Sequence, residues 1–83
     1  MRLLYFAWLR GKIGKAEEEF AVPPQVSDVK SLLVFLKARG PAYAEALKEL
    51  AAVRVAVNQD YVGLDHPVGD ADEVAIFPPV TGG

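Results

Sequence analysis

The sequence has 83 residues, none of them cysteine, a formal net charge of −2, and 52% hydrophobic residues. This length predicts one small domain over residues 1–83, and the missing thiols exclude disulfides, cysteine–zinc sites and a thiol nucleophile. The slight negative charge argues against nucleic acid and anionic membranes as partners. The first apolar run ends at Arg10, too early for a membrane span, and no small-residue cleavage site follows, so we expect a cytoplasmic protein.

The N-terminal part of the chain predicts a β-hairpin. Residues 3–9 carry aromatic and aliphatic side chains on both alternating faces, which indicates a central strand. The two glycines within residues 11–15 predict a tight turn, and residues 17–22 then form a second strand.

The middle of the chain predicts two helices. Ser27 is the expected N-cap of an amphipathic helix that ends at Gly40 and Pro41. Its apolar residues recur at helical spacing: Val29, Leu32, Leu33 and Leu36. Residues 42–51 predict a weaker second helix.

The C-terminal part predicts the remaining strands, over residues 53–58, 61–62 and 73–77, with a turn over residues 69–72. If the first and last strands lie parallel and side by side, one helix covers one face of a mixed α+β sheet. The side chains expected to face the helix are Leu3, Tyr5, Val55, Val57, Val74 and Ile76. Those expected on the opposite face are Phe6, Trp8, Ala56, Ala75 and Phe77. That face predicts an exposed apolar patch suited to a protein partner.

The side chains predict no catalytic constellation. His66 is the only histidine and precedes a proline in a loop, so no metal site is expected. The distinctive reactive group is the carboxylate after Gly82 and Gly83, a pair slim enough to enter a narrow channel. Pro78 and Pro79 favour a stiff, extended neck before it. Adenylation by ATP would make this carboxylate an acyl donor.

Five segments carry a family resemblance: Phe6-Ala7 with Arg10, residues 55–59, Asp65-His66-Pro67, residues 72–75 and residues 77–83. Together they resemble the family of molybdopterin synthase small subunits, which are ubiquitin-like sulfur carriers. The resemblance spans the whole chain and is most specific over the last eleven residues. It implies a β-grasp fold.

The resemblance also implies partners and chemistry. An E1-like adenylyltransferase uses ATP to adenylate Gly83, and a sulfur-donating enzyme supplies the sulfur of a thiocarboxylate. The tail then enters the large synthase subunit, where sulfur passes to cyclic pyranopterin monophosphate in molybdenum cofactor biosynthesis. The implied tail comprises Pro78, Pro79, Val80, Thr81, Gly82 and the carrier Gly83. The implied partner contacts are Phe6, Trp8, Tyr61, Ala75 and Phe77. No cofactor is expected on the chain itself.

Three other functions stay open: a sulfur carrier for thiamine or cysteine synthesis, a ubiquitin-like protein modifier, and a binding module without tail chemistry. Residues 77–81 argue against the first. Ala71 departs from the family pattern, which has glycine there. If that position requires positive φ, alanine costs roughly 1 kcal/mol, unless the turn uses Gly69 instead.

Overall fold

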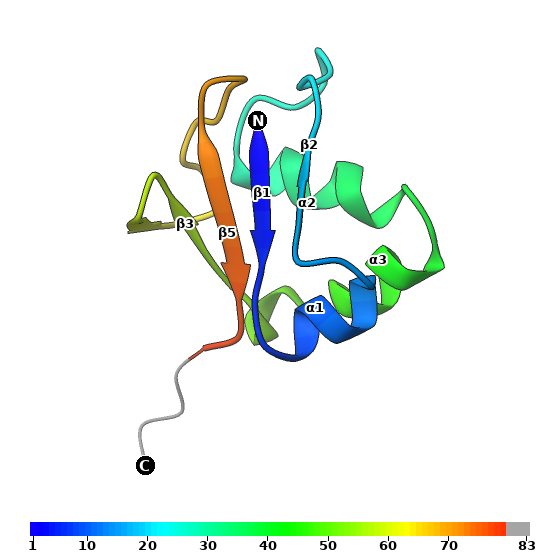
Figure 1. Ribbon diagram of the computed structural model, residues 1–83. Coiled ribbons are helices and arrows are strands. Elements are labelled where there is room, and N and C mark those ends of the chain that lie inside the picture. Colours follow the sequence, from blue (N-terminus) through cyan, green and yellow to red (C-terminus); the bar gives the residue numbers. More distant parts are fainter. Residues whose placement is uncertain (80–83) are drawn as a thin grey trace.

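The computed structural model describes residues 1–79. Its strands form one mixed sheet in the order β2-β1-β5-β3-β4 (Figure 1). Their bounds are β1 (Arg2–Tyr5), β2 (Glu17–Glu19), β3 (Arg54–Val57), β4 (Asp60–Val62) and β5 (Glu73–Phe77). The central pair, β1 and β5, is parallel, and the other neighbours are antiparallel. The predicted adjacency of the first and last strands is therefore confirmed.

The helices lie on one side of this sheet and at one end of it (Figure 1). They are α1 (Trp8–Ile13), α2 (Val29–Lys37), α3 (Pro41–Ala46) and the short 3-10 helix η1 (Leu50–Ala52). The main helix α2 covers the inner face of the sheet, as the α+β arrangement requires. Among the described residues, no helix is long and apolar enough to cross a membrane.

The core lies between α2 and the sheet. The predicted stripe of α2 is fully buried: Val29, Leu32, Leu33 and Leu36. The predicted inner side chains of the sheet are buried as well: Leu3, Tyr5, Val55, Val57, Val74 and Ile76. Alternation along the strands and the helical repeat therefore identified most of this core correctly.

The antiparallel pairing of the first two strands is confirmed, but the predicted strand to residue 9 and the tight turn after it are wrong, because the chain leaves the sheet after Tyr5 and forms α1. Ala7 turns the chain with a φ of 56° and a ψ of −135°. Leu9 and Ile13, four residues apart, are then buried on one side of α1. Gly14 ends the helix in the left-handed region with a φ of 90°. The spacing of Leu9 and Ile13 belongs to a helix, although the aromatic run before them indicates a strand.

The start of α2 differs from the prediction by one residue. Asp28, not Ser27, is the N-cap, and its carboxylate accepts a 2.8 Å hydrogen bond from the Ser31 amide. The Ser31 hydroxyl accepts in return from the Asp28 amide at 3.0 Å, which completes a capping box. Hydrogen bonding of the carboxyl to the Ser31 side chain, and then to the Ser31 amide, holds the pKa of Asp28 below its ordinary value.

Other boundaries are shorter than predicted. The second strand covers only Glu17–Glu19, and the second helix ends at Ala46 instead of residue 51, with η1 following it. Ala71 does not have a positive φ. A backbone bond of 3.1 Å from the Asp72 amide to the Gly69 carbonyl closes the turn around it. Alanine is therefore accommodated there without the strain considered above.

Candidate functional site

The outer face of the sheet, turned away from α2, carries an apolar row beside the C-terminal neck. Strand register aligns Leu4 with Ala75, Ala75 with Ala56, and Ala56 with Tyr61. Phe77 lies nearer the neck, with its ring centroid 5.4 Å from that of Tyr61. No helix formed by residues 1–79 covers this side of the sheet (Figure 1). We call these five residues the apolar row.

The described residues of the predicted contact set mostly meet at this row. Tyr61 is 80% exposed, Phe6 is 42% exposed, and Ala75 and Phe77 are partly buried. The Phe6 amide donates to the Ile76 carbonyl at 3.2 Å, which continues the β1–β5 pairing and brings Phe6 to the neck end of the sheet. The structure therefore brings Phe6, Tyr61, Ala75 and Phe77 to one part of the sheet, and their contact with a partner stays a prediction.

Two members of the predicted outer face behave differently. Ala56 lies on that face but is buried, flanked in the sheet by Ala75 and Tyr61. Trp8 is 42% exposed but begins α1, so it lies off the sheet. It lines a small cavity with residues of α3 and η1, and the Lys12 ammonium lies 5.9 Å from the centre of its ring. Trp8 therefore forms a separate surface from the apolar row.

The neck continues directly from the central strand β5. Pro78 and Pro79 follow Phe77 and are partly buried. The predicted tail residues Val80, Thr81, Gly82 and Gly83 lie outside the described residues. The described part of the chain therefore fixes where the tail begins: at the end of β5, beside Phe77.

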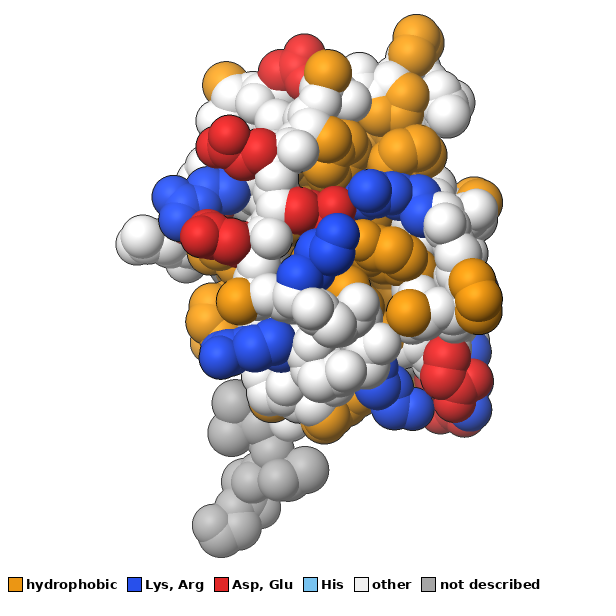
Figure 2. Space-filling model, turned by 45° about the vertical axis from the view of Figure 1, so that its right-hand side comes forward, with side chains coloured by type: hydrophobic (Ala, Val, Ile, Leu, Met, Phe, Trp, Pro, Cys, Tyr) orange, Lys and Arg blue, Asp and Glu red, His pale blue; other side chains and the backbone are white. Residues whose placement is uncertain are grey.

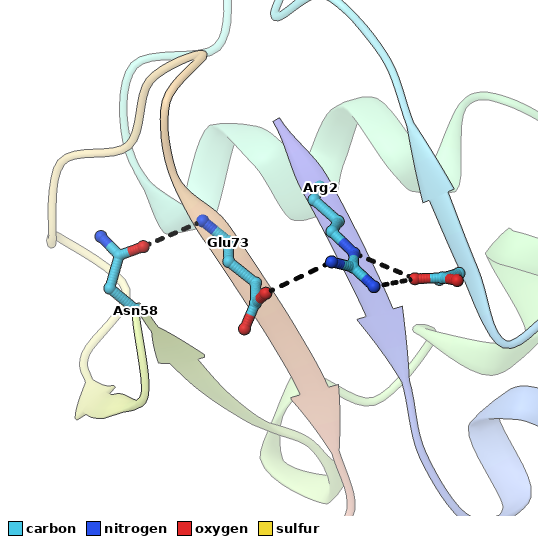
Figure 3. Close-up of polar contacts among 4 residues, drawn as sticks. Arg2, Asn58 and Glu73 are labelled. Carbon is cyan, nitrogen blue, oxygen red and sulfur yellow. Dashed lines mark hydrogen bonds and ion pairs between the residues drawn. The ribbon is translucent and has the colours of Figure 1, made fainter.

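The opposite end of the outer face is charged. Arg2 donates to Glu17 at 2.6 and 2.9 Å and lies 3.9 Å from the carboxylate of Glu73 (Figure 3). The hydrogen bond to Glu17 raises the pKa of Arg2. Asn58 completes this end by accepting a 3.0 Å bond from the Glu73 amide. Exposed pairs of this kind add little stability. Their effect is to confine the apolar surface of the outer face to the neck end.

A polar cluster that the sequence did not reveal joins β2 to β1 and α3. The carboxylate of Glu18, 11% exposed, accepts hydrogen bonds from the hydroxyls of Tyr5 at 2.5 Å and Tyr43 at 2.8 Å. Arg39 donates to it at 2.8 Å. Burial alone would raise the pKa of Glu18, but these three donors outweigh it and lower the pKa. Burial, and then the bond to Glu18, raises the pKa of Tyr5.

Aromatic rings hold Arg39 in this cluster. Its guanidinium carbon lies 5.5 Å from the ring centre of Phe20, 6.0 Å from that of Phe35 and 5.0 Å from that of Tyr43. Figure 2 shows basic and acidic side chains interspersed among hydrophobic ones on the side that it presents. The Glu18 and Arg39 groups are thus used in structure.

The family model described as the ThiS family matches residues 3–83. This chain belongs to the ThiS family. It is 40% identical over 83 residues to the molybdopterin synthase sulfur carrier subunit of Escherichia coli strain K12, an alignment covering 100% of this chain and 99% of the relative. The family resemblance seen in the sequence is therefore confirmed.

Solved structures place this ThiS-family chain among β-grasp proteins, which confirms the expected fold. A Pyrococcus furiosus protein assigned as molybdopterin converting factor subunit 1 has a TM-score of 0.76 at 35% identity, covering 95% of each chain. Small archaeal modifier protein 1 from Methanosarcina acetivorans has a TM-score of 0.72 at 26% identity, covering 99% of this chain and 94% of that one. A Helicobacter pylori complex of molybdopterin-converting factor subunits 1 and 2 has a matching chain with a TM-score of 0.63 at 24% identity, covering 99% of this chain and 96% of that one.

The parts of this ThiS-family chain that can serve a function are its neck and the outer face of its sheet. Within residues 1–79, no three His, Asp or Glu side chains gather closely enough to hold a metal ion. Glu18, the most strongly bonded carboxylate, already has three donors. The arrangement can present an apolar surface to a partner beside the point where the tail begins.

Proposed function

We propose that this chain is the sulfur carrier subunit of a molybdopterin synthase, a cytoplasmic single domain whose tail over residues 78–83 carries Gly83 as the sulfur-bearing residue. An E1-like enzyme uses ATP to convert the Gly83 carboxylate to an acyl adenylate, with release of pyrophosphate. Hydrosulfide supplied by a sulfur-donating enzyme then attacks the acyl carbon, forming the C–S bond as the acyl–phosphate bond breaks and AMP leaves. The resulting thiocarboxylate delivers its sulfur to cyclic pyranopterin monophosphate inside the large subunit.

The full-length similarity to a molybdopterin synthase sulfur carrier subunit is the observation that carries this proposal. The geometry of the neck supports it. Because β5 is a central strand paired on both sides, it gives the tail a rigid starting point. The apolar row lies beside that point and supplies a surface that the large subunit would cover while it receives the tail.

The experiment is intact-protein mass spectrometry after incubation with the E1-like enzyme, ATP and the sulfur donor. We expect one carboxylate oxygen to be replaced by sulfur in the full-length chain, and no such change in a chain lacking Gly83. Gel filtration of both chains after addition of the purified large subunit should show a complex in each case, because the deletion leaves the apolar row intact. A full-length chain that neither gains sulfur nor binds the large subunit would refute the proposal.

Protein modification is the second candidate, favoured by the likeness to small archaeal modifier protein 1. A modifier would use the same activated carboxylate but transfer it to a lysine amine, releasing AMP and forming an isopeptide bond. The higher identity to the sulfur carrier, 40% against 26%, favours sulfur transfer. Lysine-linked adducts in the mass spectrometry experiment, without a thiocarboxylate, would support the modifier.

A further inference from the structure

A groove opens at the base of the neck, between the end of β5 and the edge strand β4. Its volume is about 270 Å³, and it is lined by Arg54, Val55, Tyr61, Val62, Phe77 and Pro79. Apolar groups form most of its walls, and Arg54 supplies the one charged side chain among these lining residues. Because Pro79 is part of the wall, the groove adjoins the point where the tail begins.

Arg54 is held in place by backbone rather than by an acidic side chain. Its Nη1 donates to the carbonyl of Ala51 at 3.1 Å and to that of Val53 at 2.9 Å, at the end of η1. Within the described residues it forms no ion pair with Asp or Glu, in contrast to Arg2 and Arg39. The register of β3 against β5 sets Arg54 directly beside Phe77. A guanidinium fixed through one nitrogen keeps its other donors available for a ligand.

We propose that Arg54 is a specificity residue that binds a carboxylate side chain of the large subunit at the base of the neck. This inference rests on the proposed function and identifies one chemical feature of the partner. The aliphatic part of a glutamate or aspartate would pack against the paired rings of Tyr61 and Phe77, while its carboxylate pairs with the free donors of Arg54.

Charge and residue type favour this occupant over an apolar one. An apolar side chain alone would cover Arg54 without compensating its charge, which is unfavourable at a desolvated contact. Arginine and tyrosine are the residue types enriched at the energetic centres of protein interfaces, and Tyr61 is 80% exposed. Arginine also matches a planar carboxylate with two parallel hydrogen bonds, and its preorganisation reduces the entropy lost on binding.

The test measures the affinity and dissociation rate of the purified large subunit with full-length variants of this chain. We expect Arg54→Glu to weaken binding by about ten- to a hundredfold, mainly through faster dissociation, and Arg54→Gln to weaken it less. Lys30→Glu is the matched control, because it makes the same charge change at an exposed residue of α2. It should alter affinity by no more than about twofold. Thermal melts of each variant report whether loss of the bonds to Ala51 and Val53 disturbs the fold.

Compensating mutations in the large subunit separate direct binding by Arg54 from a structural role. A purely structural defect would not be rescued by a change in the partner. Each exposed acidic residue of the large subunit is changed to lysine and tested against Arg54→Glu, and one of these changes should restore binding. If Arg54→Glu binds as tightly as Lys30→Glu, the inference is wrong while the proposed function stands. If wild-type chain does not bind the large subunit, the proposed function itself fails. Self-association of the chain that Arg54→Glu abolishes would instead identify a second copy as the occupant and overturn the inference.

Discussion

Replacing Glu18 with alanine should destabilise the domain far more than replacing either neighbouring glutamate. The change removes the acceptor of two tyrosine hydroxyls and of Arg39. Hydrogen bonds to a charged group contribute about 1.5–3 kcal/mol each, but contributions within one cluster are not additive and Arg39 is partly solvated. We expect a loss of about 3 kcal/mol. For a domain of this size, that loss lowers Tm by roughly 12–24 °C.

The assay is thermal unfolding followed by circular dichroism at neutral pH, with Glu17→Ala as the control. Glu17 is the preceding residue of the same strand, and its partner is the exposed Arg2. An exposed pair contributes about 0–1 kcal/mol, so this control should lose only a few degrees of Tm. Equal losses for the two variants would refute the conclusion that Glu18 joins the layers of the domain.

The same cluster predicts the direction of a pH effect. The pKa of Glu18 is lower in the folded chain than its ordinary value of about 4.3. Its contribution to stability is therefore complete above about pH 4.3 and is lost as the pH falls through the lower folded pKa. Wild-type stability should thus approach that of Glu18→Gln in acid. If the stability difference between the two proteins does not shrink below about pH 4, Glu18 is not the titrating group.

Three further variants test the backbone at α1 and the apolar row. Ala7→Gly should raise the free energy of unfolding by about 1 kcal/mol in urea titrations, because glycine adopts the φ of 56° without strain. Glycine also makes the unfolded chain more flexible, which offsets part of this gain. Gly14→Ala, at a φ of 90°, should lower stability by a similar amount, and a loss in the first or a gain in the second would contradict the strain described for each. Phe77→Asp should fold normally yet bind the large subunit several kcal/mol more weakly, since the change removes an apolar ring from the contact and introduces a carboxylate that must be desolvated there. Calorimetry that finds unchanged affinity for the folded variant would rule out an interface there.

Much of the fold could be predicted because it depends on local repeats. The stripe from Val29 to Leu36 and the alternation in residues 73–77 specify their elements without help from distant residues. Helix α1 could not be predicted in this way. It requires Ala7 to adopt a backbone conformation that alanine seldom takes, and it is held by the burial of Leu9 and Ile13.

The candidate site, like the fold, could be predicted only where local sequence patterns specify it. Phe6, Tyr61 and Phe77 could be placed by alternation and by family resemblance, whereas Trp8 was misplaced once the strand was extended into α1. The partners of Glu18 lie 13 to 25 residues away, so no local pattern reveals them. The position of Arg54 beside Phe77 follows from the pairing of β3 with β5, and the sequence alone does not show that pairing.

The most direct test of the proposed sulfur carrier is molybdopterin formation from the pterin precursor, using chain with and without Gly83. Deleting one residue shortens the reach of the tail by roughly 3.3–3.6 Å, and reacting atoms must approach to about 3–3.5 Å. With the E1-like enzyme, sulfur donor and large subunit present, full-length chain should support turnover. The deleted chain should bind the large subunit with nearly unchanged affinity and form no molybdopterin. Normal turnover by the deleted chain would show that Gly83 is not the carrier and contradict the proposed function.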